Sequence, residues 1–222
     1  EKYYSELTFH YWYWKNLLDL NSDNWVGFCQ KRRFWSKNKY PEKKLYDTSN
    51  IDQSILLEPY SEWRDFEVIL SQPIKINEVK KIKMIKRGFR SLIKNPSIFF
   101  DTKKQSIKFH FDMHHGYGNL DRAIDLLGND DKEDFRNFVN ESTHFNPHIM
   151  FISKPKIIDK WFSKLFQWLE NCESIFGFKN LSGYDTQRLY AYLAERYLSY
   201  WFNKNYKVLN WPWFFFEEEK SY

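Results

Sequence analysis

Short apolar runs alternate along this chain with longer segments whose apolar residues recur at helical spacing. Runs such as Trp25-Val26-Gly27-Phe28-Cys29 lie next to turn residues and predict buried strands. Strands that alternate with helices are typical of α/β domains, so we predict a mixed sheet covered by helices. The expected strands are 25–29, 66–70, 107–114 and 148–152, and the expected helices are 5–18, 75–94, 119–127, 131–140, 155–176 and 185–202.

The composition indicates a globular domain built on aromatic side chains. Mean hydropathy is -0.71, yet 21% of the 222 residues are aromatic, whereas disordered chains contain few aromatics. This length favours one domain, 1–222. We expect no signal peptide, and the sequence contains no apolar run as long as a membrane span. Two cysteines, Cys29 and Cys172, offer no disulfide framework, which fits a reducing cytoplasm.

A basic cluster follows the first expected strand. Gln30-Lys31-Arg32-Arg33 stands at its carboxyl end, and ligands of open α/β sheets bind at that edge. Two adjacent arginines suit a diphosphate, because guanidinium groups pair with phosphate oxygens in bidentate fashion. The alternative is a solvated basic loop beside a packed aromatic helix. The net charge of +5 permits an anionic ligand without demanding nucleic acid.

Three polar residues, His110, Asp112 and His114, alternate with apolar ones in the expected strand 107–114. On a strand these three side chains share one face. They admit three interpretations: a polar face bonded to neighbouring loops, an acceptor pocket in which Asp112 or His114 takes a hydroxyl proton, or a metal site. We take His110, His114 and the adjacent His115 as candidate acceptor-binding residues.

Two segments have the character of membrane-contacting sequence. The expected helix 75–94 separates lysines and arginines from apolar residues such as Ile82, Ile85 and Phe89, and the tail 211–216 is aromatic. A basic amphipathic helix suits an anionic lipid surface. The simpler interpretation of the helix is a solvated charged face over an apolar stripe that packs in the core.

Several motifs, spread over nearly the whole chain, resemble one bacterial family. The family is catalogued as domain of unknown function 4422, occurs in capsule and lipopolysaccharide gene clusters and is assigned to GT-A-like glycosyltransferases. The resemblance implies a GT-A-like, Rossmann-related fold, with a further amino-terminal part of the nucleotide-binding region expected before Glu1. The motifs are Tyr4-Ser5-Glu6-Leu7-Thr8, Tyr11-Trp12-x-Trp14-Lys15-Asn16, Gly27-x-Cys29 with Arg32-Arg33, and the stretches 109–116, 145–152 and 194–199.

The resemblance also implies a site for a nucleotide-sugar donor. GT-A enzymes usually hold a divalent metal with Asp-x-Asp, but Gln30-Lys31-Arg32 stands at that place here, so protein cations are expected to replace the metal's charge. No cofactor is firmly implied: Mn²⁺ or Mg²⁺ suits the chemistry, but no Asp-x-Asp is present. The expected donor-binding residues are Glu6, Thr8, Lys15, Asn16, Arg32, Arg33 and Asn146, the last in a segment that is otherwise an ordinary Asn-Pro turn.

An inverting transferase needs a carboxylate as general base, and Asp112, Asp185 and Glu195 are the candidates. Their structural alternatives are a helix cap for Asp185 and an ion pair with a neighbouring arginine for Glu195.

The sequence thus predicts a glycosyltransferase of surface polysaccharide synthesis that transfers a sugar from a nucleotide-sugar donor. Its expected acceptor is a glycan or lipid-linked glycan, and its expected place is the cytoplasm, at the inner face of the membrane. The competing functions are a non-catalytic carbohydrate- or RNA-binding module and a pseudoenzyme of the same fold.

Overall fold

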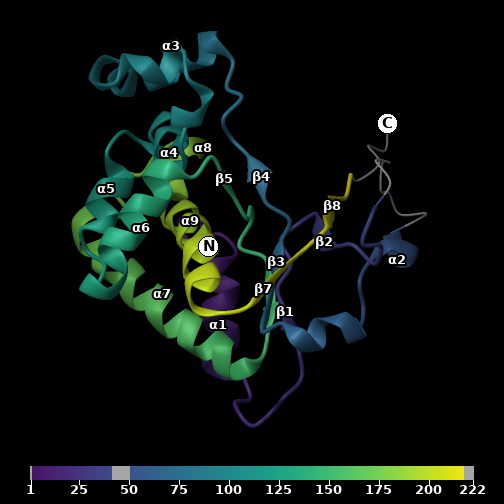
Figure 1. Ribbon diagram of the computed structural model, residues 1–222. Helices are drawn as coiled ribbons and strands as arrows, with labels where there is room; N and C mark the ends of the chain where they lie inside the picture. Colours follow the sequence, from purple (N-terminus) through teal and green to yellow (C-terminus); the bar gives the residue numbers. More distant parts are fainter. Residues whose placement is uncertain (1, 42–50, 218–222) are drawn as a thin grey trace, which may run out of the picture.

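Within the residues that the structure describes, 2–41 and 51–217, a four-stranded mixed sheet in the order β1-β6-β3-β7 forms the centre of this computed structural model (Figure 1). Strand β6 runs antiparallel to β1 and β3, whereas β3 and β7 are parallel. Strands β2 and β8 pair beside this sheet, and β4 pairs with β5. The strands are β1 (Val26–Gly27), β2 (Arg33–Trp35), β3 (Val68–Ser71), β4 (Ile74–Lys75), β5 (His144–Phe145), β6 (Phe151–Ser153), β7 (Val208–Trp211) and β8 (Trp213–Phe215).

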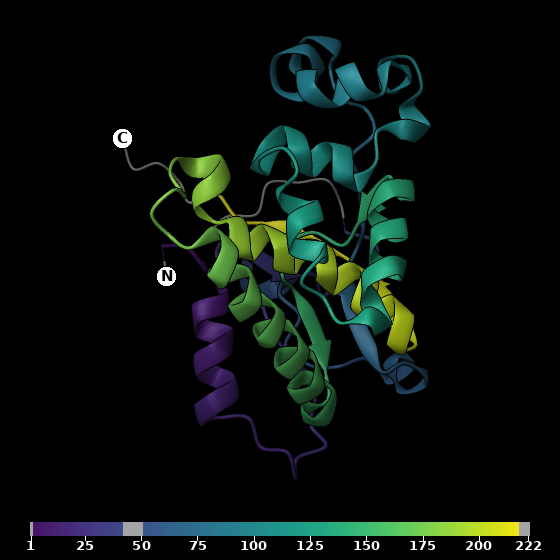
Figure 2. The ribbon, with the colours of Figure 1, turned by 90° about the vertical axis from the view of Figure 1, so that its left-hand side faces the viewer.

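Helices pack on one face of the central sheet. Val68 and Leu70 of β3 join the large core that contains the buried residues of α1, α7 and α9, and Figure 2 shows these helices side by side. The predicted α/β class, a mixed sheet covered by helices, is confirmed. The helices are α1 (Leu7–Asn16), α2 (Ile51–Ser54), α3 (Lys81–Lys94), α4 (Ile107–His115), α5 (Asn119–Ile124), α6 (Asn129–Glu141), α7 (Pro155–Phe176), α8 (Tyr184–Gln187) and α9 (Leu189–Asn205).

The other face of the sheet packs on a tryptophan cluster. Ile69 of β3 points away from the helices and contacts a core that includes Trp35, Trp63 and Trp211. The indole rings of Trp63 and Trp211 lie 5.1 Å apart in an edge-to-face arrangement. Aromatic side chains therefore supply most of the buried surface on this side, as the composition indicates.

The expected strand 107–114 is wrong: this segment is helix α4. Ser106 begins it, because its hydroxyl accepts a hydrogen bond from the Phe109 amide. The helix lies between two cores, with Ile107 and Phe111 in the large one and Phe109 and Met113 in a smaller one under α3. Apolar residues on two opposite helix faces produce the alternation that resembles a strand.

The apolar stripe of the expected helix 75–94 is also wrongly assigned to the core. Helix α3 begins only at Lys81, and Ile82, Ile85 and Phe89 are exposed. Its buried residues are Met84, Gly88 and Ser91, which face α4. The tail 211–216, in contrast, is built into β7 and β8, with Trp211 buried.

Several boundaries differ from those expected, although α7 begins and ends as predicted. Helix α6 begins at Asn129, before the expected start at Asp131, and the buried Asp131 carboxylate accepts from the Tyr197 hydroxyl. The expected helix 185–202 is interrupted at Arg188, so Asp185 lies in the short α8 and does not cap α9. Strand β2 begins in the basic cluster, at Arg33, where the sequence predicts no strand. Residues 42–50 fall outside the described residues.

Candidate functional site

Polar side chains from all four central strands meet at one edge of the sheet. Gln30 follows β1, Ser71 ends β3 and Asn210 lies in β7, while antiparallel β6 enters from the same edge after His148. In open α/β sheets this edge is the usual place for a ligand. The prediction that a basic strand end would lie there is therefore compatible with the observed topology.

Asn146 ties this edge together. Its side chain is buried, and its amide group donates to the Ser71 carbonyl oxygen at 2.6 Å and to Asn210 Oδ1 at 2.8 Å. Its oxygen accepts from the Ser199 hydroxyl at 2.6 Å. Both amide hydrogens are used within the protein, so the exposed Asn210, which the sequence analysis missed, presents the nearer free surface. A donor-binding role for Asn146 stays a prediction.

Arg196 is a buried cation next to this edge. Only 2% of the residue is exposed, and its guanidinium group lies 3.8 Å from the centre of the Phe145 ring. One terminal nitrogen donates to the Glu195 carboxylate. Within the described part of the chain, its Nε has no hydrogen-bond partner. A buried donor without a partner is costly, which marks this nitrogen as a candidate contact for a ligand.

Glu195 connects Arg196 to the loop before β6. Its other carboxylate oxygen accepts a 2.5 Å hydrogen bond from the His148 amide. His148 has a φ of 65°, a conformation that side-chain-bearing residues seldom adopt. Burial, together with the charges of Arg33 and Arg196, lowers the pKa of His148 to about 3. The imidazole is therefore neutral near neutral pH, and no described residue partners its buried Nε2.

The three candidate acceptor-binding histidines lie in the later part of helix α4, and the charge of Arg196 lowers the pKa of each. On helix α4 the rings of His110 and His114 lie one turn apart, 4.6 Å between centroids. The His115 ring stacks on Tyr192 at 3.7 Å, and its Nδ1 donates to the Asp185 carbonyl oxygen. Side chains of α4 thus meet α8 and α9 here, although α4 is far from both in the sequence.

Burial and positive charge keep these histidines neutral. Burial first, then the charge of Arg196, lowers the pKa of His110 to about 2 and that of His115 to about 3. The pKa of His114 falls to about 4 through burial and the charges of Lys83 and Arg87. Such imidazoles are weak bases but good partners for neutral hydroxyl groups. Proton abstraction by His114 is therefore disfavoured.

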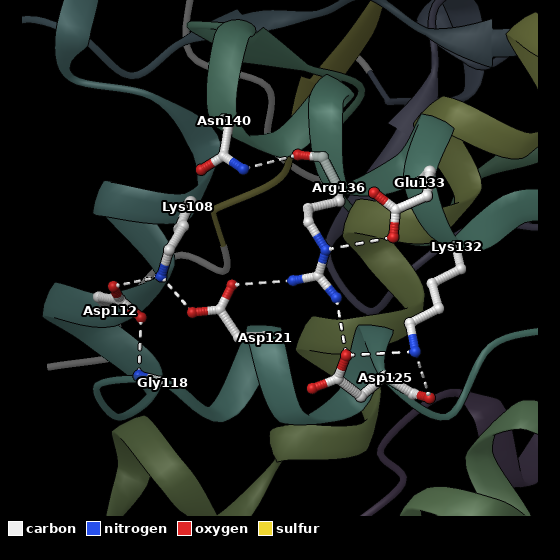
Figure 3. A network of polar contacts seen from close by, with 9 residues as sticks. All are labelled: Lys108, Asp112, Gly118, Asp121, Asp125, Lys132, Glu133, Arg136 and Asn140. Carbon is white, nitrogen blue, oxygen red and sulfur yellow. Dashed lines mark hydrogen bonds and ion pairs between the residues drawn. The ribbon is translucent and has the colours of Figure 1, made fainter.

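Asp112 does not share a face with these histidines, so the expected shared strand face is wrong. Figure 3 shows its carboxylate accepting from Lys108 Nζ at 3.0 Å and from the Gly118 amide at 2.9 Å. Lys108 is also paired with Asp121 at 2.7 Å, which continues to Arg136. Asp112 therefore belongs to a network that holds α4, α5 and α6 together.

The remaining two base candidates differ in their surroundings. Asp185 is about half exposed and pairs with Arg87 at 3.0 Å, and Arg87 also contacts His114 Nδ1 at 3.2 Å. Glu195 has a side chain only 15% exposed and lies between His148 and Arg196. Of the three carboxylates, Glu195 is the one that contacts residues with unpartnered buried nitrogens, His148 and Arg196.

The expected donor residues of the amino-terminal segment lie in two separate places in the structure. Glu6 lies near Gln30 at the sheet edge; burial raises its pKa, but hydrogen bonds from Ser5 and Gln30 and the charge of Arg188 outweigh this and lower it. Thr8 and Lys15 instead line a groove of about 700 Å³ between α1 and α7. The residues around Arg196 do not line this groove.

Lys15 and Asn16 have local partners on α1. The Lys15 ammonium lies 3.3 Å from the centre of the Trp14 ring, and the Asn16 amide donates to the Trp12 carbonyl oxygen at 2.7 Å. Both residues are exposed at the end of α1 away from Glu6. The structure thus does not bring Thr8, Lys15 and Asn16 to the site, and their role stays a prediction.

The two adjacent arginines both lie over the Phe215 ring but differ in their other contacts. Arg32, with a φ of 64°, donates from Nε to the Phe216 carbonyl oxygen at 3.1 Å and lies over the Phe215 ring. Arg33 lies close enough to His148 to lower its pKa, and the buried Nε of Arg33 has no partner among the described residues. Arg33 is therefore the better placed of the two to meet an anion.

The candidate metal ligands from the sequence are His110, Asp112 and His114. In the ranges 2–41 and 51–217, no group of three or more His, Cys, Asp and Glu residues is arranged to hold a metal ion. His110 and His114 form a pair on one helix face, but Asp112 is held on another side. Transfer without Mn²⁺ or Mg²⁺ stays a prediction, which chelation followed by addition of Mn²⁺ tests.

Comparison with known families decides the relationship, because one family matches residues 1–206, described as a domain of unknown function (DUF4422). The chain belongs to the DUF4422 family. This confirms the resemblance drawn from the sequence motifs. No curated protein matches the sequence.

The fold of this DUF4422 chain is similar to that of a solved glycosyltransferase. The match is to the WbbM bifunctional glycosyltransferase in its apo structure, with a TM-score of 0.71 and 18% sequence identity. It covers 97% of this chain and 37% of the WbbM chain. The likeness establishes a glycosyltransferase-like α/β fold, in agreement with the expected GT-A-like class.

Proposed function

We propose that this chain is a glycosyltransferase that moves a sugar from a nucleotide-sugar donor to a glycan or lipid-linked glycan acceptor. The observation that carries the proposal is the cluster of unpartnered buried polar atoms at the sheet edge, on a glycosyltransferase-like fold. Among the described residues these atoms include Gln30 Oε1, Arg33 Nε, His148 Nε2, His110 Nδ1 and Arg196 Nε. Their number indicates a surface prepared for a polar ligand.

In this proposal the donor diphosphate contacts Arg33. The bond from the anomeric carbon to the diphosphate breaks, and the leaving group takes the electron pair, so negative charge grows on its oxygens. Arg33 and the nearby Arg196 supply positive charge at the sheet edge where a metal would stand in other transferases. Arg32 contributes less, because its Nε already serves the Phe216 carbonyl oxygen.

The acceptor lies against α4 and α9. The neutral imidazoles of His110, His114 and His115 exchange hydrogen bonds with sugar hydroxyls. The acceptor oxygen forms the new bond to the anomeric carbon, and in an inverting transfer Glu195 takes its proton. Both Glu195 oxygens are engaged in the free protein, so the acceptor hydroxyl replaces one of these partners before transfer.

Surface polysaccharide synthesis is the pathway that we propose for this activity. It is supported by the family resemblance of the motifs and by the similarity to a bifunctional glycosyltransferase. A lipid-linked acceptor would place the enzyme in the cytoplasm, at the inner face of the membrane. Among the helices of the described residues, none has the length and apolar character to cross a bilayer.

The first experiment is a thermal-shift screen with UDP, GDP, CMP and their sugars, followed by product mass for any donor that binds. We expect one nucleoside diphosphate to raise the melting temperature. Arg33→Ala should reduce that shift, whereas the exposed Arg64→Ala is the matched control for loss of one positive charge. An unchanged shift in Arg33→Ala would remove the assignment of the diphosphate site.

The same screen separates the competing functions. A shift with oligonucleotides alone would favour an RNA-binding module, and a shift with glycans alone would favour a carbohydrate-binding module. Donor binding without any product would indicate a pseudoenzyme. Activity that is abolished by a chelator and restored by Mn²⁺ would contradict metal-free transfer at Arg33.

A further inference from the structure

Helix α3 presents an apolar stripe to solvent. Ile82, Ile85, Phe89 and Ile93 are spaced by three or four residues, so their side chains share one helix face. Their exposed fractions are 71, 52, 59 and 64%. Phe100, which follows the short 3-10 helix after α3, is 82% exposed. Isolated exposed apolar residues are common, but a continuous stripe of this kind marks a contact surface.

The stripe is fixed outward by the packing of α3 on α4. The buried face of α3 consists of Met84, Gly88 and Ser91. A Cβ atom at Gly88 would lie 2.9 Å from a ring carbon of Phe109, so the two helices are in close contact through the glycine. Rotating the apolar stripe inward would place large side chains where only a hydrogen fits. Figures 1 and 2 show α3 at one end of the molecule, outside α4.

Positive charges flank the stripe. The segment 80–94 contains seven lysines and arginines and no acidic residue, as its letters KKIKMIKRGFRSLIK show. Lys86, Arg90 and Lys94 follow one another along the flank next to the stripe, at helical spacing. Lys86, Arg87, Arg90 and Tyr117 help to line a hollow of about 290 Å³ beside Phe89. Asp112 also lines it, but its carboxylate is paired with Lys108. A hollow with several cations and an aromatic hydroxyl is suited to a phosphate group.

We propose that α3 docks this protein on an anionic lipid bilayer. The helix lies parallel to the surface, with the stripe in the boundary between headgroups and acyl chains and the cations against lipid phosphates. A bilayer fits better than a folded protein partner, because the apolar stripe occupies one helix face and the charged residues beside it are all positive. An anionic bilayer surface can contact both the apolar stripe and the cations along the whole length of the helix.

Docking through α3 would present the acceptor site to the membrane. Helix α4 packs directly on α3 and carries His110 and His114, and Arg87 of α3 contacts His114 at 3.2 Å. A sugar on a lipid carrier would therefore reach the histidines from the bilayer side. This second step rests on the proposed glycosyltransferase function, whereas docking itself does not.

The test is sedimentation of the whole chain with vesicles of phosphatidylcholine, with and without added phosphatidylglycerol. We expect binding to the anionic vesicles that weakens with salt. Phe89→Glu should weaken binding by about tenfold or more, and Arg90→Gln by about fivefold. Phe9→Glu is the matched control, because Phe9 is exposed to a similar extent, 55%, on α1.

Three results would overturn the proposal. They are no binding to either vesicle, an equal loss in Phe9→Glu and Phe89→Glu, and a dimer that Phe89→Glu converts to a monomer without any vesicle binding. Circular dichroism of each variant checks that the fold is retained. Turnover of a soluble acceptor should be unchanged in Phe89→Glu, so docking can fail while transfer survives. Vesicle binding without donor binding would instead contradict the proposed function alone.

Discussion

His10 allows a direct test of how the aromatic core around α1 responds to pH. Its imidazole is 1% exposed, contacts Phe28 at 4.5 Å between centroids, and also packs near Phe162. Burial lowers its pKa to about 4, although the charge of Glu6 opposes the shift. We predict that His10→Leu becomes relatively more stable than the wild-type protein as the pH falls.

The sign and size of this effect follow from proton linkage. The unfolded chain holds His10 with a pKa of about 6.5, so it binds a proton at a pH where the folded chain does not. Neutral His10 makes its full contribution to the free energy of unfolding above about pH 6.5, and this contribution is lost as the pH falls toward about 4. Between about pH 7.5 and 5.5 the loss is roughly 1.3 kcal/mol for this one group. The leucine variant does not suffer it.

Urea unfolding of both proteins at the two pH values measures the effect. The packing change caused by leucine is the same at both, and the other buried histidines are present in both proteins. The exposed His144→Leu is the control for removal of a surface imidazole. A difference in unfolding free energy between His10→Leu and wild type that is equal at both pH values would contradict a lowered pKa for His10 in the folded protein.

Other substitutions test the roles of single side chains. Glu195→Gln should lower kcat by about 10²-fold or more, measured by donor turnover, and should also lower the melting temperature, because it removes the counter-charge of the buried Arg196. Asp112→Asn should instead lower the melting temperature, because it weakens the contacts with Lys108 and Gly118; a pure kcat effect would contradict this role. Asn146→Ala should cost about 1–3 kcal/mol of unfolding free energy, measured in urea, because it leaves buried partners unsatisfied. Gly88→Leu should lower the melting temperature through its clash with Phe109, and an unchanged value would show that α3 is not held as closely as described.

Local sequence patterns predict the positions of many helices and strands but not the cores into which these elements pack. The helix α7 was predicted to the residue, because Pro155 is favoured at a helix start and its apolar residues follow one stripe. Helix α4 was mistaken for a strand, because its two opposite faces enter different cores. A period of two and a helix buried on two sides give the same letters over so short a segment.

The candidate site shows the same division. The basic cluster before Phe34 was found from its place after a strand, yet only the fold distinguishes Arg33, near His148, from Arg32, which bonds the carbonyl of Phe216. Asn210 lies in no motif, and the motif 145–152 does not single out His148 among its residues. Their importance arises from neighbours on other strands and on α9.

The sequence by itself determined the α/β class, the family, and the order of its strongest helices, because apolar period and helix-start residues act within a few turns of chain. The tertiary structure decided which side chains meet around Arg196 and which apolar face of α3 stays in solvent. Both depend on contacts between segments far apart in the sequence. A pattern states which residues are apolar, but only the packing of Gly88 against Phe109 determines that the stripe beside it points outward.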